Sequence, residues 1–204
     1  MVATILDPGL EERLIEERRA AGADRYDEVW ERVYVMAPIA NDEHQDFVGD
    51  WTAVLKIAVQ WAGKGLVRPG VYVSDRVDDW KSNYRCPDVV VYLNDTTAEN
   101  HGEFWYGGPD FAIEITSPYD KTREKFDFYA KVNTRELLIV DRDPWALELY
   151  RLMDGEMRLV GTSTPESSRV LRSEIVPLSF GLKGGTARPA IEVRHDDGWQ
   201  SWMI

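Results

Sequence analysis

The sequence predicts an α/β fold in which a mixed β-sheet is flanked by helices. Two short apolar runs, Val89–Leu93 and Phe111–Ile115, have the length and the β-branched content of buried strands. A helical pattern follows the second run, and Glu136–Asp141 with Trp145–Leu152 then resembles a hairpin. A strand–helix–strand unit continued by antiparallel strands gives a mixed sheet.

The length and composition predict one globular domain spanning residues 1–204, with a core at about 26–181, an N-terminal helix and a C-terminal tail. Eight tryptophans and a hydrophobic fraction of 44% argue against disorder. No apolar stretch is long enough to span a membrane, and the N-terminus lacks the features of a signal peptide. Cys86 is the only cysteine, so we expect a buried thiol and a cytoplasmic protein.

Two acids lie at or within the apolar runs. Asp88 directly precedes the first run, and Glu114 interrupts the second. Because side chains alternate along a strand, Glu114 faces away from Ile113 and Ile115. We therefore expect Glu114 to point into a more polar space.

A lysine follows on the next predicted helix. Ser117 is typical of an N-cap before Pro118, and the helix is expected to run to about Val132. Three strand residues after Glu114 climb about 10 Å, and seven helical residues return about 10 Å along the sheet. Lys125 should therefore lie level with Glu114, at the border of an inward stripe of Phe126, Tyr129 and Ala130.

Two acids and a lysine brought together in this way fit a metal site for phosphodiester chemistry. Asp88 and Glu114 would bind Mg²⁺ or Mn²⁺ through carboxylate oxygens, and Lys125 would hold a phosphate or the attacking water. Taken singly, each acid also has a simpler interpretation. Asp88 is typical of a turn before a strand, and Glu114 could form a salt bridge to Lys125 or Arg123 without any catalysis.

Several short segments occur together along the chain. They are PD before the first run, EITSP at the second acid, R-E-K-x-x-x-Y on the helix, and RELLIVDRD followed by LELYRL, with YVMAP and EHQ nearer the N-terminus. From about Tyr26 to about Gly181 the chain resembles the Uma-type restriction endonucleases, a bacterial group of the PD-(D/E)XK nuclease superfamily. The resemblance implies a restriction-endonuclease-like core with Asp88 and Glu114 as metal ligands.

One position departs from the superfamily signature. The signature lysine stands two residues after the second acid, where this chain has Thr116. Lys125 matches the helix lysine common in the family and is the expected replacement. The leading hypothesis is Mg²⁺- or Mn²⁺-dependent hydrolysis of DNA by a homodimer, with the Ile115 carbonyl completing the metal shell. Thr116 and the acidic surface favour the alternative, a dimeric binding or scaffolding module that keeps the fold without the reaction.

Other polar residues are weaker candidates. Tyr129, one turn beyond Lys125, could hydrogen-bond within the site or pack. His44 could touch a phosphate or a metal-bound water, but a histidine in a first helical turn is more often solvated or part of a cap. An acid from the Tyr26–Ala37 region could approach the metal, but Glu28 and Glu31 are expected at a solvated strand edge. The three acids of the Asp75–Trp80 stretch lack the spacing of an EF-hand and predict a solvated loop.

The net charge of −12 opposes binding to DNA, because affinity for nucleic acid comes mainly from neutralising phosphates. The segment 118–135 is an exception, with five basic and three acidic side chains. We therefore expect weak or protein-assisted DNA binding.

The remaining elements complete the expected fold. Helices are predicted at Leu10–Ala21 and from Asn41 to Ala62, and strands at Tyr26–Ala37, Gly65–Ser74, Met157–Val160 and Arg169–Leu182. The Asn94–Gly108 loop carries aromatic residues that could form a lid, stack on bases, plug the core or contact a second subunit. The tail Pro189–Ile204 is expected to pack, on this chain or on a partner.

Overall fold

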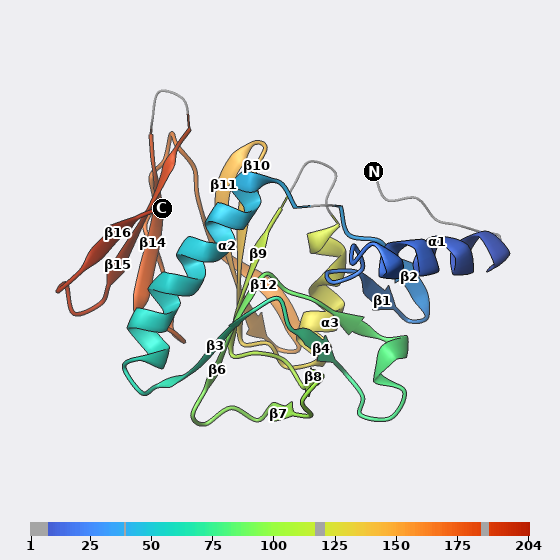
Figure 1. Cartoon of the computed structure of the whole chain (residues 1–204). Helices are drawn as coiled ribbons and strands as arrows, with labels where there is room; N and C mark the ends of the chain where they lie inside the picture. Colours follow the sequence, from blue (N-terminus) through green and yellow to red (C-terminus); the bar gives the residue numbers. More distant parts are fainter. Residues whose placement is uncertain (1–7, 39, 117–120, 185–187) are drawn as a thin grey trace.

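The computed structural model describes residues 8–38, 40–116, 121–184 and 188–204. At its centre is a six-stranded sheet in the order β12-β11-β10-β9-β6-β3 (Figure 1). Among the described strand pairs of this sheet only β9 and β10 run parallel, so the sheet is mixed, as predicted. Its strands are β3 Gly65–Pro69, β6 Val89–Leu93, β9 Phe111–Ile115, β10 Glu136–Arg142, β11 Trp145–Met153 and β12 Glu156–Ser163.

Helices cover both faces of the central sheet (Figure 1). On one face lies α2 (Asp42–Leu55), which continues as a π-helical turn (Lys56–Gln60). On the other face a 3-10 turn (Thr122–Lys125) leads into α3 (Phe126–Lys131), which connects β9 to β10. Ile113 packs in the core on the α2 side, whereas Ala112 packs with Tyr129 on the α3 side. This alternation places Glu114 on the α3 face.

A second, four-stranded sheet packs on α2. Its order is β13-β14-β15-β16, and in Figure 1 α2 lies between it and the central sheet. Trp51 of α2 meets Phe180 with ring centroids 5.5 Å apart. The tail therefore packs on this chain, through β15 paired with β14. The strand expected over 169–182 is two strands; the bounds are β13 Leu171–Arg172, β14 Leu178–Lys183, β15 Ala190–His195 and β16 Ser201–Met203.

A third sheet lies on the α3 side and brings the N-terminal part of the chain close to that helix (Figure 1). Its order is β2-β1-β5-β4-β8-β7, and Val73 of β4 and Trp105 of β8 share a core with α3. The helix α1 (Pro8–Ala20) and a 3-10 turn (Trp80–Ser82) accompany it. The strands are β1 Glu28–Trp30, β2 Val33–Val35, β4 Tyr72–Ser74, β5 Tyr84–Arg85, β7 Glu99–Asn100 and β8 Phe104–Tyr106.

Two predicted strands are each broken in two. The strand expected over 26–37 is a hairpin, with Glu31 and Arg32 in its turn at positive φ (46° and 70°). Such a turn normally has Asn-Gly or a similar pair, so Glu31-Arg32 does not predict it. The strand expected over 65–74 breaks at Gly70, whose φ is +54°, and its halves join different sheets.

The helix expected over 118–132 differs at its start. Its proposed cap, Ser117 to Asp120, lies outside the described residues. The described part is a 3-10 turn followed by six α-helical residues. The long aromatic loop, in turn, contains β7 and β8, and Trp105 stacks on the buried Tyr92 with centroids 3.6 Å apart. Trp105 therefore plugs the core.

Candidate functional site

The two predicted acids lie opposite each other at one end of the central sheet. β6 and β9 are antiparallel, with Val89 paired to Ile113. Asp88 directly precedes β6, so extending this register by one residue brings its backbone beside that of Glu114 on the neighbouring strand. Like charges in directly opposite positions of a sheet repel each other. The fold therefore concentrates negative charge at this point.

Asp88 is held between the sheet and α2. Its Oδ2 accepts a hydrogen bond from the Ile115 backbone N–H at 2.7 Å, and its Oδ1 lies 2.9 Å from His44 Nε2. The N–H and C=O of one strand residue point to the same side, so the Ile115 carbonyl also lies on the Asp88 side. The side chains of His44 and Asp88 are 15% and 17% exposed, so each is only partly accessible to solvent.

His44 was expected to be solvated or to form part of a cap. Its backbone N–H does donate to the N-cap residue Asn41. The prediction is wrong for the ring, which turns inward to Asp88. The side chain therefore contacts a candidate metal ligand.

Lys125 lies level with Glu114, as the strand and helix geometry predicted. Its Nζ is 3.0 Å from Glu114 Oε1 and 2.9 Å from Glu28 Oε1. The Tyr129 hydroxyl donates to the same Glu114 oxygen. Thus the 3-10 turn supplies an ammonium and α3 supplies a hydroxyl to one buried carboxylate.

Glu28 differs from its expected place at a solvated strand edge. The structure buries it within the site. Besides Lys125, it accepts hydrogen bonds from the Cys86 backbone N–H at 2.9 Å and from Trp30 Nε1 at 2.6 Å. The side chain of Glu31, in the turn after β1, is 64% exposed, as expected. Glu28 and Lys125 are 97 positions apart, and no local pattern joins them.

The electrostatics of the site favour the protonated form of Glu114. Burial raises the pKa of Glu114 to about 8, against the lowering effect of the Lys125 ammonium, and the Asp88 and Glu28 carboxylates raise it further. Burial likewise raises the pKa of the Cys86 thiol, in line with its expected structural role. The raised pKa thus reflects burial of Glu114 beside two other carboxylates, which the Lys125 ammonium only partly offsets.

This pKa predicts how stability depends on pH in the metal-free protein. Between pH ~5 and ~8 the folded chain holds a proton on Glu114 that the unfolded chain has released, so the free energy of unfolding falls as pH rises. Replacing Glu114 by glutamine should reduce this fall by about 1–3 kcal/mol. Urea unfolding at pH 5 and pH 8 with a chelator measures it. Equal pH dependence in both proteins would contradict the raised pKa.

The donor set fits a divalent cation that prefers oxygen. Within the described residues no three His, Cys, Asp or Glu side chains form a cluster able to hold an ion. Mg²⁺, however, keeps several waters and commonly uses only one or two carboxylates together with substrate phosphates. Asp88 beside the Ile115 backbone, and Glu114 on the same strand end, are the candidate donors of such a set, and a cation would offset the repulsion between the two carboxylates.

Comparison with known proteins identifies the family. The model of the Uma2 family, described as "Putative restriction endonuclease", matches residues 13–183. The chain belongs to the Uma2 family. The site described above lies inside the matched segment, as do the central and third sheets and strands β13 and β14 of the second sheet.

A solved structure supports the fold of this Uma2 protein. It is described as "a putative nuclease belonging to DUF820 from Anabaena variabilis ATCC 29413". It aligns with a TM-score of 0.57 at 18% sequence identity, over 72% of this chain and 80% of its own. At this identity the similarity shows the shared restriction-endonuclease-like α/β fold. No curated protein matches, and no helix among the described residues is long and apolar enough to cross a membrane.

Proposed function

We propose that this Uma2 protein is an endonuclease that hydrolyses DNA phosphodiester bonds with Mg²⁺ or Mn²⁺. The observation that carries the proposal is that Asp88 and Glu114 lie on neighbouring strands at one end of the sheet, with Lys125 Nζ 3.0 Å from Glu114 Oε1. Asp88, Glu114 and the Ile115 carbonyl would hold the ion. When bound, the ion supplies Lewis-acid stabilisation of the charge that develops on the phosphate.

The protein groups around the acids have separate tasks in this proposal. Lys125 donates a hydrogen bond to a phosphate oxygen or to the attacking water. Glu28 keeps the ammonium in place when Glu114 turns to the ion, because Lys125 contacts both acids. Tyr129 fixes the Glu114 carboxylate from the helix, and His44 fixes Asp88 from α2.

The surface charges support weak DNA binding. Arg123, a cation close to the site in sequence, is already within 2.9 Å of both Asp141 and Glu148. A DNA phosphate would have to compete with these two carboxylates. DNA that reaches the site therefore gains little from this arginine, which fits binding helped by another protein or by a second subunit. A homodimer, a cytoplasmic location and a single domain remain predictions; light scattering on the purified chain tests the first.

Cleavage of supercoiled plasmid tests the function directly. We expect nicked or linear product with added Mn²⁺ or Mg²⁺ and none when a chelator is present. An Asp154→Asn variant, altered at an 81% exposed acid, should cleave like the wild type and serves as the control for a surface substitution. Failure of metal-supplied protein to cut any DNA would contradict the proposal.

Calorimetry with Mn²⁺ separates the nuclease from a scaffolding module. The nuclease should bind Mn²⁺ saturably, and the binding should disappear when Glu114 is changed. A module that has only kept the fold needs no such binding. Thr116, which occupies the usual lysine position, is the residue that favours this alternative.

A further inference from the structure

Two segments are joined at three points along their length. One is β1 with the turn that follows it, and the other is the Thr122–Lys125 turn with α3. At one end Glu28 meets Lys125 at 2.9 Å. At the other end Glu31 meets Lys131 at 3.7 Å. Three residues of extended chain span about 10 Å, and six helical residues span about 9 Å, so the two spacings match.

Arg85 makes the middle connection. Its guanidinium carbon lies 4.6 Å from the Trp30 ring centroid and 4.3 Å from that of Phe128. It also donates from Nη1 to the Val29 carbonyl at 2.9 Å. The buried arginine is therefore held between an aromatic ring of β1 and one of α3, which is a favourable cation–π arrangement.

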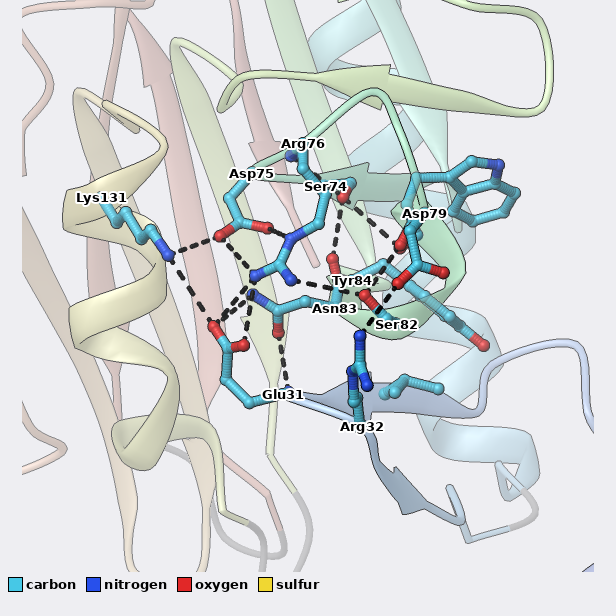
Figure 2. Close-up of polar contacts among 12 residues, drawn as sticks. Glu31, Arg32, Ser74, Asp75, Arg76, Asp79, Ser82, Asn83, Tyr84 and Lys131 are labelled. Carbon is cyan, nitrogen blue, oxygen red and sulfur yellow. Dashed lines mark hydrogen bonds and ion pairs between the residues drawn. The ribbon is translucent and has the colours of Figure 1, made fainter.

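Asp75 is at the centre of the outer connection (Figure 2). Lys131 Nζ lies 2.5 Å from its Oδ2, and Arg76 Nε lies 2.8 Å from its Oδ1. Arg76 also donates to both carboxylate oxygens of Glu31 at 3.1 Å. Asp75 thus links the helix cation Lys131 to the arginine that holds the hairpin turn.

Asn83 fixes the same turn from the side. Its amide group donates to Glu31 Oε1 at 2.9 Å and accepts from the Glu31 backbone N–H at 3.0 Å (Figure 2). The backbone N–H of Arg32 donates to the Ser82 carbonyl at 2.7 Å. The tip of the hairpin is therefore bonded to the 75–83 loop through both backbone and side chains.

Asp75 was expected in a solvated loop, and this prediction is wrong. Its side chain is only 4% exposed. Although burial acts in the opposite direction, hydrogen bonds from Arg76 and Lys131 lower the pKa of Asp75 below its usual range. An anion so placed between two cations is costly to remove, because the cations would then repel each other.

We propose that Asp75, Arg76, Glu31 and Lys131 form a clamp that docks the β1–β2 hairpin on α3 and so positions Glu28 against Lys125. The clamp lies outside the catalytic acids and touches none of them in the described structure. It acts because the Glu31–Lys131 and Glu28–Lys125 contacts lie at matching spacings on either side of Arg85. These clamp residues are positioning residues, and their effect on catalysis rests on the proposed nuclease function.

Asp75→Asn tests the clamp, with Asp79→Asn as its matched control. Asp79 belongs to the same loop, is 64% exposed, and pairs only loosely with the exposed Arg32 at 3.5 Å. Asparagine also tolerates the positive φ of position 79. The first measurement is amide hydrogen exchange by mass spectrometry, which requires no enzymatic activity.

We expect exchange in Asp75→Asn to rise about tenfold or more over 28–35 and over 122–131, because charged hydrogen bonds are lost. Exchange over 136–153, in the central sheet, should stay unchanged. Asp79→Asn should match the wild type throughout. If Asp75→Asn does not fold, Lys131→Gln, altered at a 56% exposed side chain, should show the same pattern more weakly.

The second measurement is plasmid cleavage by the same proteins. Misplacing Lys125 should lower kcat about tenfold or more, with KM and Mn²⁺ affinity unchanged, because Asp88 and Glu114 belong to the sheet. Unchanged exchange over 28–35 and 122–131 would overturn the clamp. Faster exchange over these two segments together with a wild-type kcat would overturn its positioning role. If the wild type cuts no DNA, the nuclease proposal fails and the exchange data alone decide the clamp.

Discussion

Glu114→Gln should lower metal-dependent plasmid cleavage by about 10³-fold or more. Glutamine has the same shape but lacks the negative charge that a divalent cation requires. It also leaves Asp88 as the single carboxylate among the proposed metal ligands. Single-turnover cleavage with Mn²⁺ measures the rate, and calorimetry should show that saturable Mn²⁺ binding is lost.

Glu148→Gln is a matched control for this experiment. Ile139 of β10 pairs with Glu114 on one side and with Glu148 on the other, so both acids lie in one row across the sheet. Glu148 contacts Arg123 and Tyr150 instead of Lys125. The control should retain cleavage. If both variants cleave like the wild type, Glu114 is no part of the catalytic machinery.

The part of the site that could be predicted from the sequence depends on short spans of chain. Alternation over five residues places Glu114 on the face opposite Ile113, and the structure confirms that face. The distance from Glu114 to Lys125 is only eleven positions, and standard rises along a strand and a helix were enough to bring them level. The βαβ unit that fixes the mixed sheet is equally local.

The part that could not be predicted depends on pairings across long spans. Glu28 reaches Lys125 only because the hairpin, β5 and α3 meet in three dimensions. The hairpin itself was hidden, since Glu31 and Arg32 adopt positive φ without the usual turn residues. The sequence predicts Asp75 to be a loop acid because its second cationic partner, Lys131, comes from a distant helix. Charged residues with remote partners look like surface residues in a sequence.

Lys125→Met should separate catalysis from metal binding. Methionine fills a similar volume without charge, so cleavage should fall about 10²- to 10³-fold. Mn²⁺ affinity should not weaken, because Lys125 no longer competes with the ion for Glu114 Oε1. Cleavage and calorimetry on the same protein measure both. Lys121→Met, altered at a 38% exposed lysine near the same turn, should change neither.

A second substitution then tests whether the lysine role has moved within the fold. Thr116 is buried and lies on the same strand face as Glu114, at the position where the superfamily signature has its lysine. Adding Thr116→Lys to Lys125→Met should restore about tenfold of the lost cleavage, because an ammonium again reaches the space beside Glu114. Wild-type cleavage by Lys125→Met alone would contradict the role of Lys125. Absence of rescue in a folded double variant would show that the site requires an ammonium held by Glu28 as well.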